Sequence, residues 1–250
     1  MNTCNITLAC ILVAITPTWA LAAEAQVAVA ANFAEPIKAI AAVLEKTTGH
    51  TIKVTLGATG KLYAQIKNGA PFDVLLSADT ATPEKLEKEG LGQPGSRFTY
   101  ATGKLVLWSA KAGRVDDKGT VLKAPNLSKV SFANPKVAPY GAATVQAIEK
   151  LGLTAALTPK LVQGESIGQT FTFASTGNAD VGFVAMSQVL QGGKLKSGSM
   201  WVVPQNLYDP IRQDAVVMQK SAGNEAAQAL MKLLKSPNIK DLIRSYGYDL

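Results

Sequence analysis

Residues able to act as acids, bases or nucleophiles are scarce in this chain of 250 residues. It has one histidine, His50, and its two cysteines, Cys4 and Cys10, both lie near the N-terminus. A Ser-His-Asp triad would need His50 as its base, and a lone histidine in a turn is more often a surface residue. The inventory also excludes a metal centre built from clustered histidine and cysteine. These residues predict that the chain is not an enzyme and needs no cofactor.

Residues 57–62 (GATGKL) partly match a nucleotide-binding loop, because Gly-Lys follows a predicted strand. The rest of that motif is missing: only two residues separate the glycines, and Leu62 stands where serine or threonine would bind magnesium. What remains is a strand end, small residues and the start of a helix. Free backbone N–H groups and a partial positive charge meet at such a point, which suits an anion.

The same construction occurs at three more places. Asn32 leads from the first predicted strand into the first helix, as an N-cap with Glu35 three residues on, in the pattern of a capping box. Residues 139–141 precede a helix expected to begin near Ala143, and Ser166 is the predicted N-cap of a helical run through residue 175. Each is an ordinary turn or cap by itself. Together, on one cleft, they predict a binder of small anions.

The wider pattern alternates short apolar runs with helical segments, which predicts an α/β fold with mostly parallel sheets and helices on both faces. The predicted strands are 26–31, 52–56, 73–77, 104–108, 130–133, 181–184 and 200–203. The predicted helices are 36–46, 61–68, 82–89 with Thr82 as N-cap, 144–151, 224–235 and 238–246. A two-lobed protein whose chain crosses near 102–105 and near 204–211 fits this order. Ligands of such folds bind at the carboxyl ends of strands.

The N-terminus predicts export. Residues 8–15 are apolar, residues 1–23 carry no charge, and the small residues Ala20 and Ala22 follow. The apolar run is shorter than the ~20 residues of a membrane-spanning helix. We therefore interpret residues 1–22 as a cleaved signal peptide, against the alternative of a buried N-terminal helix. Both cysteines fall inside it, so the mature protein would have no thiol.

The net charge of +7 favours anionic partners through long-range steering. The lysines are scattered, with no basic block and no interleaved aromatic residues, so nucleic-acid binding is not predicted. With 47% hydrophobic and 17% charged residues the chain is expected to fold around a core as a soluble protein that is not embedded in a membrane.

Several segments resemble the periplasmic molybdate-binding proteins of ABC transporters, from about residue 26 to 250. They are 29–33 (VAANF), 57–62 (GATGKL), 69–79 (GAPFDVLLSAD), 134–135 with 139–141, 182–184 and 244–248 (RSYGY). The resemblance implies a type II periplasmic-binding-protein fold, with residues 24–103 plus 210–250 as lobe I and 104–209 as lobe II. It implies a periplasmic, monomeric receptor that captures molybdate or tungstate and delivers it to an ABC permease.

The resemblance also implies the ligand set. Asn32 would give its backbone N–H and side-chain amide, Thr59 its hydroxyl and N–H, and Tyr140 and Ile167 their backbone N–H groups. Molybdenum would be held only as the oxyanion, with no protein atom on the metal. Many relatives have a tyrosine where this chain has Ala185, and Tyr140, on the opposite wall, is the candidate to replace it.

Two charged residues near this set are not expected to bind the anion. Glu165 is expected to point away, and Lys61 to steer at most.

Alternatives follow from the same residues. Molybdate, tungstate and sulfate are fully ionised near neutral pH and only accept hydrogen bonds, so a sulfate or thiosulfate receptor of the same fold stays open until the pocket size is known. Monohydrogen phosphate would want an acceptor as well, and the four residues supply none. A two-lobed hydrolase would need a nucleophile, base or metal in the cleft. A sensor domain of a transcription regulator would need a DNA-binding segment and no signal peptide.

Overall fold

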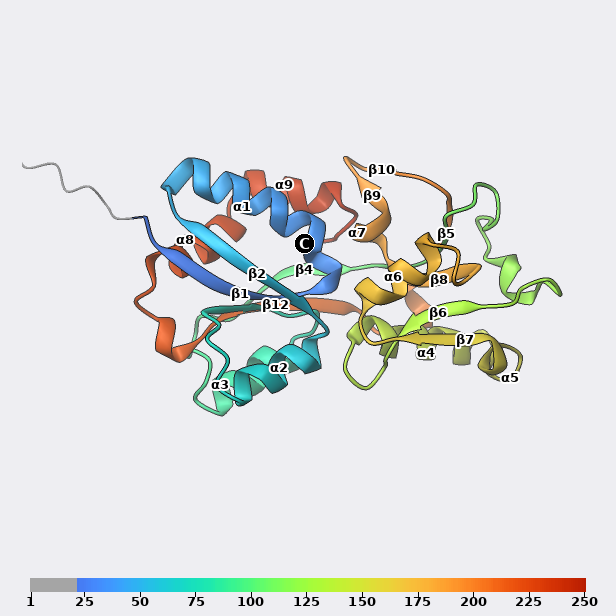
Figure 1. The fold of residues 1–250 in the computed structure, drawn as a ribbon, viewed down its shortest axis with the longest axis horizontal. Coiled ribbons are helices and arrows are strands. Elements are labelled where there is room, and N and C mark those ends of the chain that lie inside the picture. Colours follow the sequence, from blue (N-terminus) through green and yellow to red (C-terminus); the bar gives the residue numbers. More distant parts are fainter. Residues whose placement is uncertain (1–21) are drawn as a thin grey trace, which may run out of the picture.

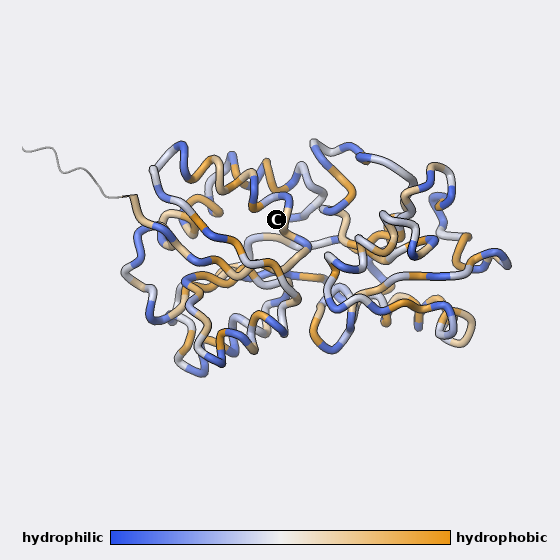
Figure 2. Tube along the Cα trace, in the orientation of Figure 1, coloured by the Kyte–Doolittle hydropathy of each residue, from blue (hydrophilic) through white to orange (hydrophobic). Residues whose placement is uncertain are grey.

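The computed structural model describes residues 22–250, so the predicted signal peptide lies almost entirely outside the described residues. Figure 1 shows two α/β units side by side, each built around a five-stranded sheet. Hydrophobic residues are concentrated along the central strands and alternate with hydrophilic ones along the outer helices (Figure 2). Among the described residues no helix combines the length and the apolar character that crossing a membrane requires.

The first unit contains the sheet of order β2-β1-β3-β12-β4. Its strands are β1 (Glu24–Ala30), β2 (Thr51–Gly57), β3 (Val74–Leu76), β4 (Phe98–Gly103) and β12 (Ile211–Val217), and its helices are α1 (Ala34–Thr48), α2 (Thr59–Lys67), α3 (Ala81–Lys88), α8 (Glu225–Leu234) and α9 (Pro237–Ser245). Alternate residues of β1 face opposite layers: Val27 and Val29 pack with α1, α8 and α9, and Ala28 packs with α2 and α3. The first sheet is therefore covered on both faces.

The second unit contains the sheet of order β11-β5-β8-β6-β7. Its strands are β5 (Leu105–Ser109), β6 (Val130–Ala133), β7 (Leu161–Gly164), β8 (Val181–Ala185) and β11 (Ser199–Val202), and its helices are α4 (Pro139–Lys150), α5 (Thr154–Leu157), α6 (Ile167–Ser175) and α7 (Met186–Val189). A small ladder of β9 (Leu190–Gln191) and β10 (Lys194–Leu195) precedes β11. Leu107 and Phe183 face α4, whereas Val106 and Val184 face α6 and α7 on the other side.

Both sheets are mixed, which corrects the expectation of mostly parallel pairing. The strands joined through helices pair in parallel: β1 with β2 and β3, and β6 with β7 and β8. Every antiparallel pair within the two five-stranded sheets includes β5 or β12. These are the strands by which the chain enters and leaves the second unit, after Gly103 and before Ile211. Because the chain crosses into the second unit through β5 and returns through β12, these two strands run antiparallel to the strands beside them.

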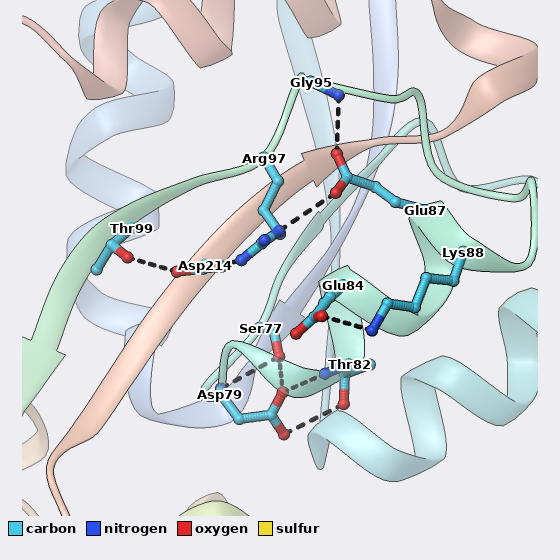
Figure 3. A network of polar contacts seen from close by, with 10 residues as sticks. All are labelled: Ser77, Asp79, Thr82, Glu84, Glu87, Lys88, Gly95, Arg97, Thr99 and Asp214. Atoms are coloured by element: carbon cyan, nitrogen blue, oxygen red, sulfur yellow. Dashed lines mark hydrogen bonds and ion pairs between the residues drawn. The ribbon is translucent and has the colours of Figure 1, made fainter.

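The starts of α3 and α4 also differ from prediction. Helix α3 begins at Ala81, and its N-cap residue is Thr80 and not Thr82. The Thr80 side chain makes no cap bond, and the Asp79 carboxylate accepts the Thr82 N–H at 2.8 Å instead (Figure 3). Helix α4 begins at Pro139, earlier than the expected residue 144. Proline suits the first helical position because the N–H it lacks would have no partner inside the helix.

Gly141 allows the first turn of α4 to lie directly against the end of β6. A Cβ atom at this position would collide with the carbonyl oxygen of Ala133. We predict that Gly141→Ala destabilises the fold by ~1–3 kcal/mol through overpacking, which lowers Tm by roughly 3–9 °C for a chain of this size. Thermal unfolding measures this. Gly223→Ala is the control, because open space surrounds Gly223. Equal Tm values for the two variants would contradict the close approach.

Candidate functional site

The four residues expected to bind an anion lie together in one small cavity between the two units. Its volume is about 10 Å³, and its lining comes from both sheets: Ala30, Ala31, Asn32, Gly57, Ala58, Thr59, Ala78, Ala138, Pro139, Tyr140 and Ile167. Asn32, Thr59, Tyr140 and Ile167 are all buried. The segments that carry them are far apart in the chain, so only the folded arrangement brings them together.

Helix N-termini form most of the cavity wall. Helix α2 begins at Thr59 and α6 at Ile167, while Tyr140 carries the first N–H of α4 after Pro139. Asn32 is the middle residue of a short 3-10 helix, Ala31–Phe33. The first N–H groups of a helix have no acceptor within it. The cavity thus collects backbone donors and the positive ends of three α-helices.

The Thr59 hydroxyl is oriented to donate. Its oxygen accepts the backbone N–H of Ala78 at 3.0 Å. One lone pair is therefore occupied, and the hydroxyl proton is available for a ligand in the cavity. The sequence indicated Thr59 as a site residue just before a helix expected at 61–68. It did not indicate that the Ala78 N–H would hold the Thr59 hydroxyl in place.

Asn32 is not the N-cap that the sequence suggested. Helix α1 begins at Ala34 with Phe33 as its cap, without a side-chain cap bond, so the capping box with Glu35 is wrong. The intervening 3-10 turn rotates Asn32 inward, where its Nδ2 donates to Gln213 Oε1 at 2.7 Å and to the Tyr248 hydroxyl at 2.9 Å. Its Oδ1 is buried without a partner. Asn32 therefore lines the cavity, and hydrogen bonds to residues of the C-terminal part of the chain hold its side chain in place.

The Tyr140 side chain belongs to the same interior layer. Its hydroxyl accepts from Gln213 Nε2 at 3.2 Å, and burial raises its pKa well above the ordinary value, so it stays neutral. Burial likewise raises the pKa of Tyr248. Ala185, where relatives were expected to carry a tyrosine, is buried at the end of β8 and is not part of the cavity lining.

Charged side chains stay outside the cavity lining. Lys61 of α2 forms an ion pair of 2.7 Å with Glu165, which precedes α6, so the pair joins the two units with both side chains about half exposed. The Gly60 N–H donates to Val137 O at 2.9 Å across the same gap. On the other side of the cavity, Ser187 Oγ donates to Asn32 O at 2.7 Å. These three contacts join the two units on both sides of the cavity.

The groups that catalysis would need are engaged elsewhere. His50 Nδ1 accepts the Ala23 N–H at 3.0 Å beside the ladder of β1 and β2. The Asp116 carboxylate is exposed and caps a turn through the N–H and hydroxyl of Thr120. Within residues 22–250, no three or more histidine, cysteine, aspartate or glutamate side chains gather as a metal site.

Sequence reasoning missed Gln213, which hydrogen-bonds to both Asn32 and Tyr140, and Ser187, which donates to Asn32 O. It also missed Tyr100, whose hydroxyl donates to Gln213. Tyr248 had a signal, since it lies in the terminal segment 244–248 that carried the resemblance. Gln213 had none: it lies between Arg212 and Asp214 in β12, a strand that was not predicted from the sequence.

This geometry defines a class: an α/β binding protein of the periplasmic-binding-protein fold, with a ligand cavity between two sheet units. The chain matches the bacterial extracellular solute-binding protein family over residues 25–249, and it belongs to that family.

Individual relatives are more specific. The chain is 60% identical over 231 residues to the molybdate-binding protein ModA of Azotobacter vinelandii, with 92% of each chain covered. It is 55% identical to ModA of Rhodobacter capsulatus, over 92% of this chain and 89% of the relative. The solved structure of the Azotobacter vinelandii periplasmic molybdate-binding protein superposes with a TM-score of 0.88 at 43% identity, covering 91% of this chain and 99% of that one. A sulfate-binding protein of Mycobacterium tuberculosis, at 14% identity and a TM-score of 0.73, shares the fold alone.

The ion pair between Lys61 and Glu165 is predicted to contribute little, because both side chains are about half exposed. Such pairs are worth ~0–1 kcal/mol. We expect Glu165→Gln to lower the free energy of unfolding by less than about 1 kcal/mol, with the difference vanishing in high salt. Glu84→Gln, which breaks the exposed pair with Lys88 inside the first unit, is the control. A much larger loss at Glu165 alone would show that the pair governs closure.

Proposed function

We propose that this chain is an extracytoplasmic receptor that captures molybdate or tungstate with neutral hydrogen-bond donors and delivers it to an ABC permease. The observation that carries the proposal is the convergence of helix N-termini and the Thr59 hydroxyl on a cavity whose lining contains no charged side chain. Asn32, Thr59, Tyr140 and Ile167 are its binding residues, and the protein performs no chemistry on the anion.

A donor-only cavity suits a fully ionised oxyanion. Molybdate accepts hydrogen bonds and donates none, and each bond from a neutral donor to the dianion is worth roughly 1.5–3 kcal/mol. Several such bonds bind it without a lysine or arginine. A neutral lining also avoids burying an unpaired charge when the cavity is empty.

The identity of the relatives favours molybdate over sulfate. The relatives at 60% and 55% identity are molybdate-binding proteins. The sulfate-binding neighbour shares only 14% of aligned residues. The donor chemistry suits both anions, so the choice rests on this relatedness.

The proposal includes the arrangement of the whole protein. Residues 24–103 with 210–250 form one lobe, residues 104–209 the other, and the two close around the anion by a hinge motion. Residues 1–22 are a cleaved signal that directs a monomer to the periplasm. The two chain crossings beside β5 and β12 support the hinge.

The proposal is tested by thermal melts of residues 24–250, stripped of bound anion, with molybdate, tungstate, sulfate and phosphate at matched ionic strength. A ligand at 100 times its Kd adds about 2.7 kcal/mol of stability, which raises Tm by roughly 5–10 °C. We expect this from micromolar molybdate or tungstate and not from millimolar sulfate. Equal shifts with sulfate would overturn the substrate, and no shift with any oxyanion would overturn the site.

The Thr59 hydroxyl is expected to be one of the anion donors. Thr59→Val removes one charge-assisted bond, so molybdate affinity should fall about 10- to 150-fold in calorimetry. Thr59→Ser keeps the hydroxyl and should bind within a few-fold of the original protein. Thr55→Val, on the exposed part of β2, is the matched control. Unchanged affinity in Thr59→Val would remove Thr59 from the site.

A further inference from the structure

A buried hydrogen-bond network lies directly behind the anion cavity, centred on Gln213 of β12. Gln213 Oε1 accepts from Asn32 Nδ2 at 2.7 Å and from the Tyr100 hydroxyl at 3.1 Å, and its Nε2 donates to the Tyr140 hydroxyl at 3.2 Å. Tyr248 lies 2.9 Å from Asn32 Nδ2. Gln213 is fully buried and touches residues of both units. It therefore connects two of the proposed anion ligands, Asn32 and Tyr140.

The bond directions of this network leave one group unsatisfied. Asn32 Oδ1 is buried without a partner. The Tyr140 hydroxyl accepts from Gln213, and the neighbouring Tyr248 hydroxyl is within hydrogen-bonding reach of it. An unsatisfied buried polar group costs about 1–3 kcal/mol. A carbonyl oxygen in the wall of the cavity would also repel an anion.

Reversing both amides together gives Asn32 Oδ1 a partner and leaves Asn32 Nδ2 as the one group of the network without a partner in the protein. The two ends of an amide have nearly the same shape, so hydrogen-bond partners decide which end points where. In the reversed sense Gln213 Nε2 donates to Asn32 Oδ1 and to the Tyr100 oxygen, while the Tyr100 proton goes to Ser77 O, 3.0 Å away. Gln213 Oε1 then accepts the Tyr140 proton. Asn32 Nδ2 is left free, as a donor on the cavity wall.

We infer that Gln213 is a positioning residue that holds the Asn32 amide with its NH₂ group toward the anion; this inference rests on the proposed function. The bound anion selects the sense of the network in which Asn32 donates. In that sense Gln213 Oε1 also accepts the Tyr140 proton, and this second bond fixes the start of α4 on the opposite wall. One buried amide thereby orients donors on both sides of the cavity.

The backbone of β12 supports this role. The register with β4 shifts between Gln213 and Asp214, and such bulges re-aim a side chain beside functional sites. Asp214 is anchored by Arg97 at 2.8 Å and by the Thr99 hydroxyl at 2.6 Å (Figure 3). Gly103 of β4 leaves room for the network, because a Cβ there would collide with the Tyr140 hydroxyl. Gln213 is therefore held in place from its own strand and from the neighbouring one.

The test is a double-mutant cycle between Gln213 and Asn32, with molybdate affinity measured by calorimetry. Gln213→Leu should weaken binding about 10- to 100-fold in the original protein, because Asn32 loses the partner that orients it. In the Asn32→Ala background the same change should cost only a few-fold. An equal loss in both backgrounds, or no loss in either, overturns the inference.

Matched controls separate positioning from general damage to the core. The first control is Gln93→Leu, which makes the same substitution outside the cavity lining, at a glutamine whose Oε1 is buried without a partner. This variant should leave molybdate affinity unchanged. Gln213→Glu is the second variant, since a carboxylate only accepts and forces Asn32 to turn its NH₂ away from the anion. It should bind more weakly than Gln213→Leu. Binding equal to that of the original protein would overturn the inference.

A measurement on the unmutated protein is independent of folding defects. In ¹⁵N-labelled protein, the side-chain NH₂ signals of Asn32 and Gln213, assigned by their loss in Asn32→Ala and Gln213→Leu, should both shift when molybdate is added. A shift at Asn32 with none at Gln213 contradicts the coupled network. If the original protein binds no molybdate or tungstate, the proposed function fails and the inference fails with it. If the original protein binds molybdate but Gln213→Leu has the same effect in both backgrounds, the inference fails and the proposed function stands.

Discussion

The constraint on which this structure depends is that the first N–H groups of a helix have no partner inside it. Burying such donors is costly unless something accepts from them. Here three α-helices and a 3-10 turn, contributed by both α/β units, place these groups around one cavity. In the proposed function an oxyanion would accept from all of them at once, and the cavity lies between the two units. The strand order, the two chain crossings and the helix starts together place these N-termini at the cavity.

The neutrality of the lining follows from the same physics. A dianion held by dipoles and hydroxyls needs no buried counter-charge, so the cavity can be empty without stranding a lysine or arginine. The charges that do join the units, Lys61 and Glu165, stand half exposed outside the lining, where solvent screens them. The tyrosines behind the wall are kept neutral by burial, which raises their pKa. Electrostatic attraction at long range is left to the overall charge of +7.

The two crossing strands explain why distant parts of the chain meet at Asn32. Because β12 returns from the second unit and runs antiparallel between β3 and β4, it brings Gln213 behind the N-terminal strand. The C-terminal segment then folds back so that Tyr248 contacts the same asparagine and Ser187. The cavity lining is thus contributed by both units, and the C-terminal part of the chain supports it at Asn32.

The resemblance of its segments to molybdate-binding proteins pointed to the four residues that line the cavity, and the sequence by itself determined the α/β class and most strand and helix positions. It did so because strand-to-helix transitions and N-terminal turns are local features, which neighbouring residues dictate. Tertiary structure decided the mixed pairing of the sheets, since the direction of β5 and β12 depends on how the chain crosses. It also decided that Asn32 faces inward instead of capping α1, and that Gln213 stands behind it. A hydrogen bond between residues 181 positions apart leaves no periodicity or motif in the sequence, and only packing brings its two ends together.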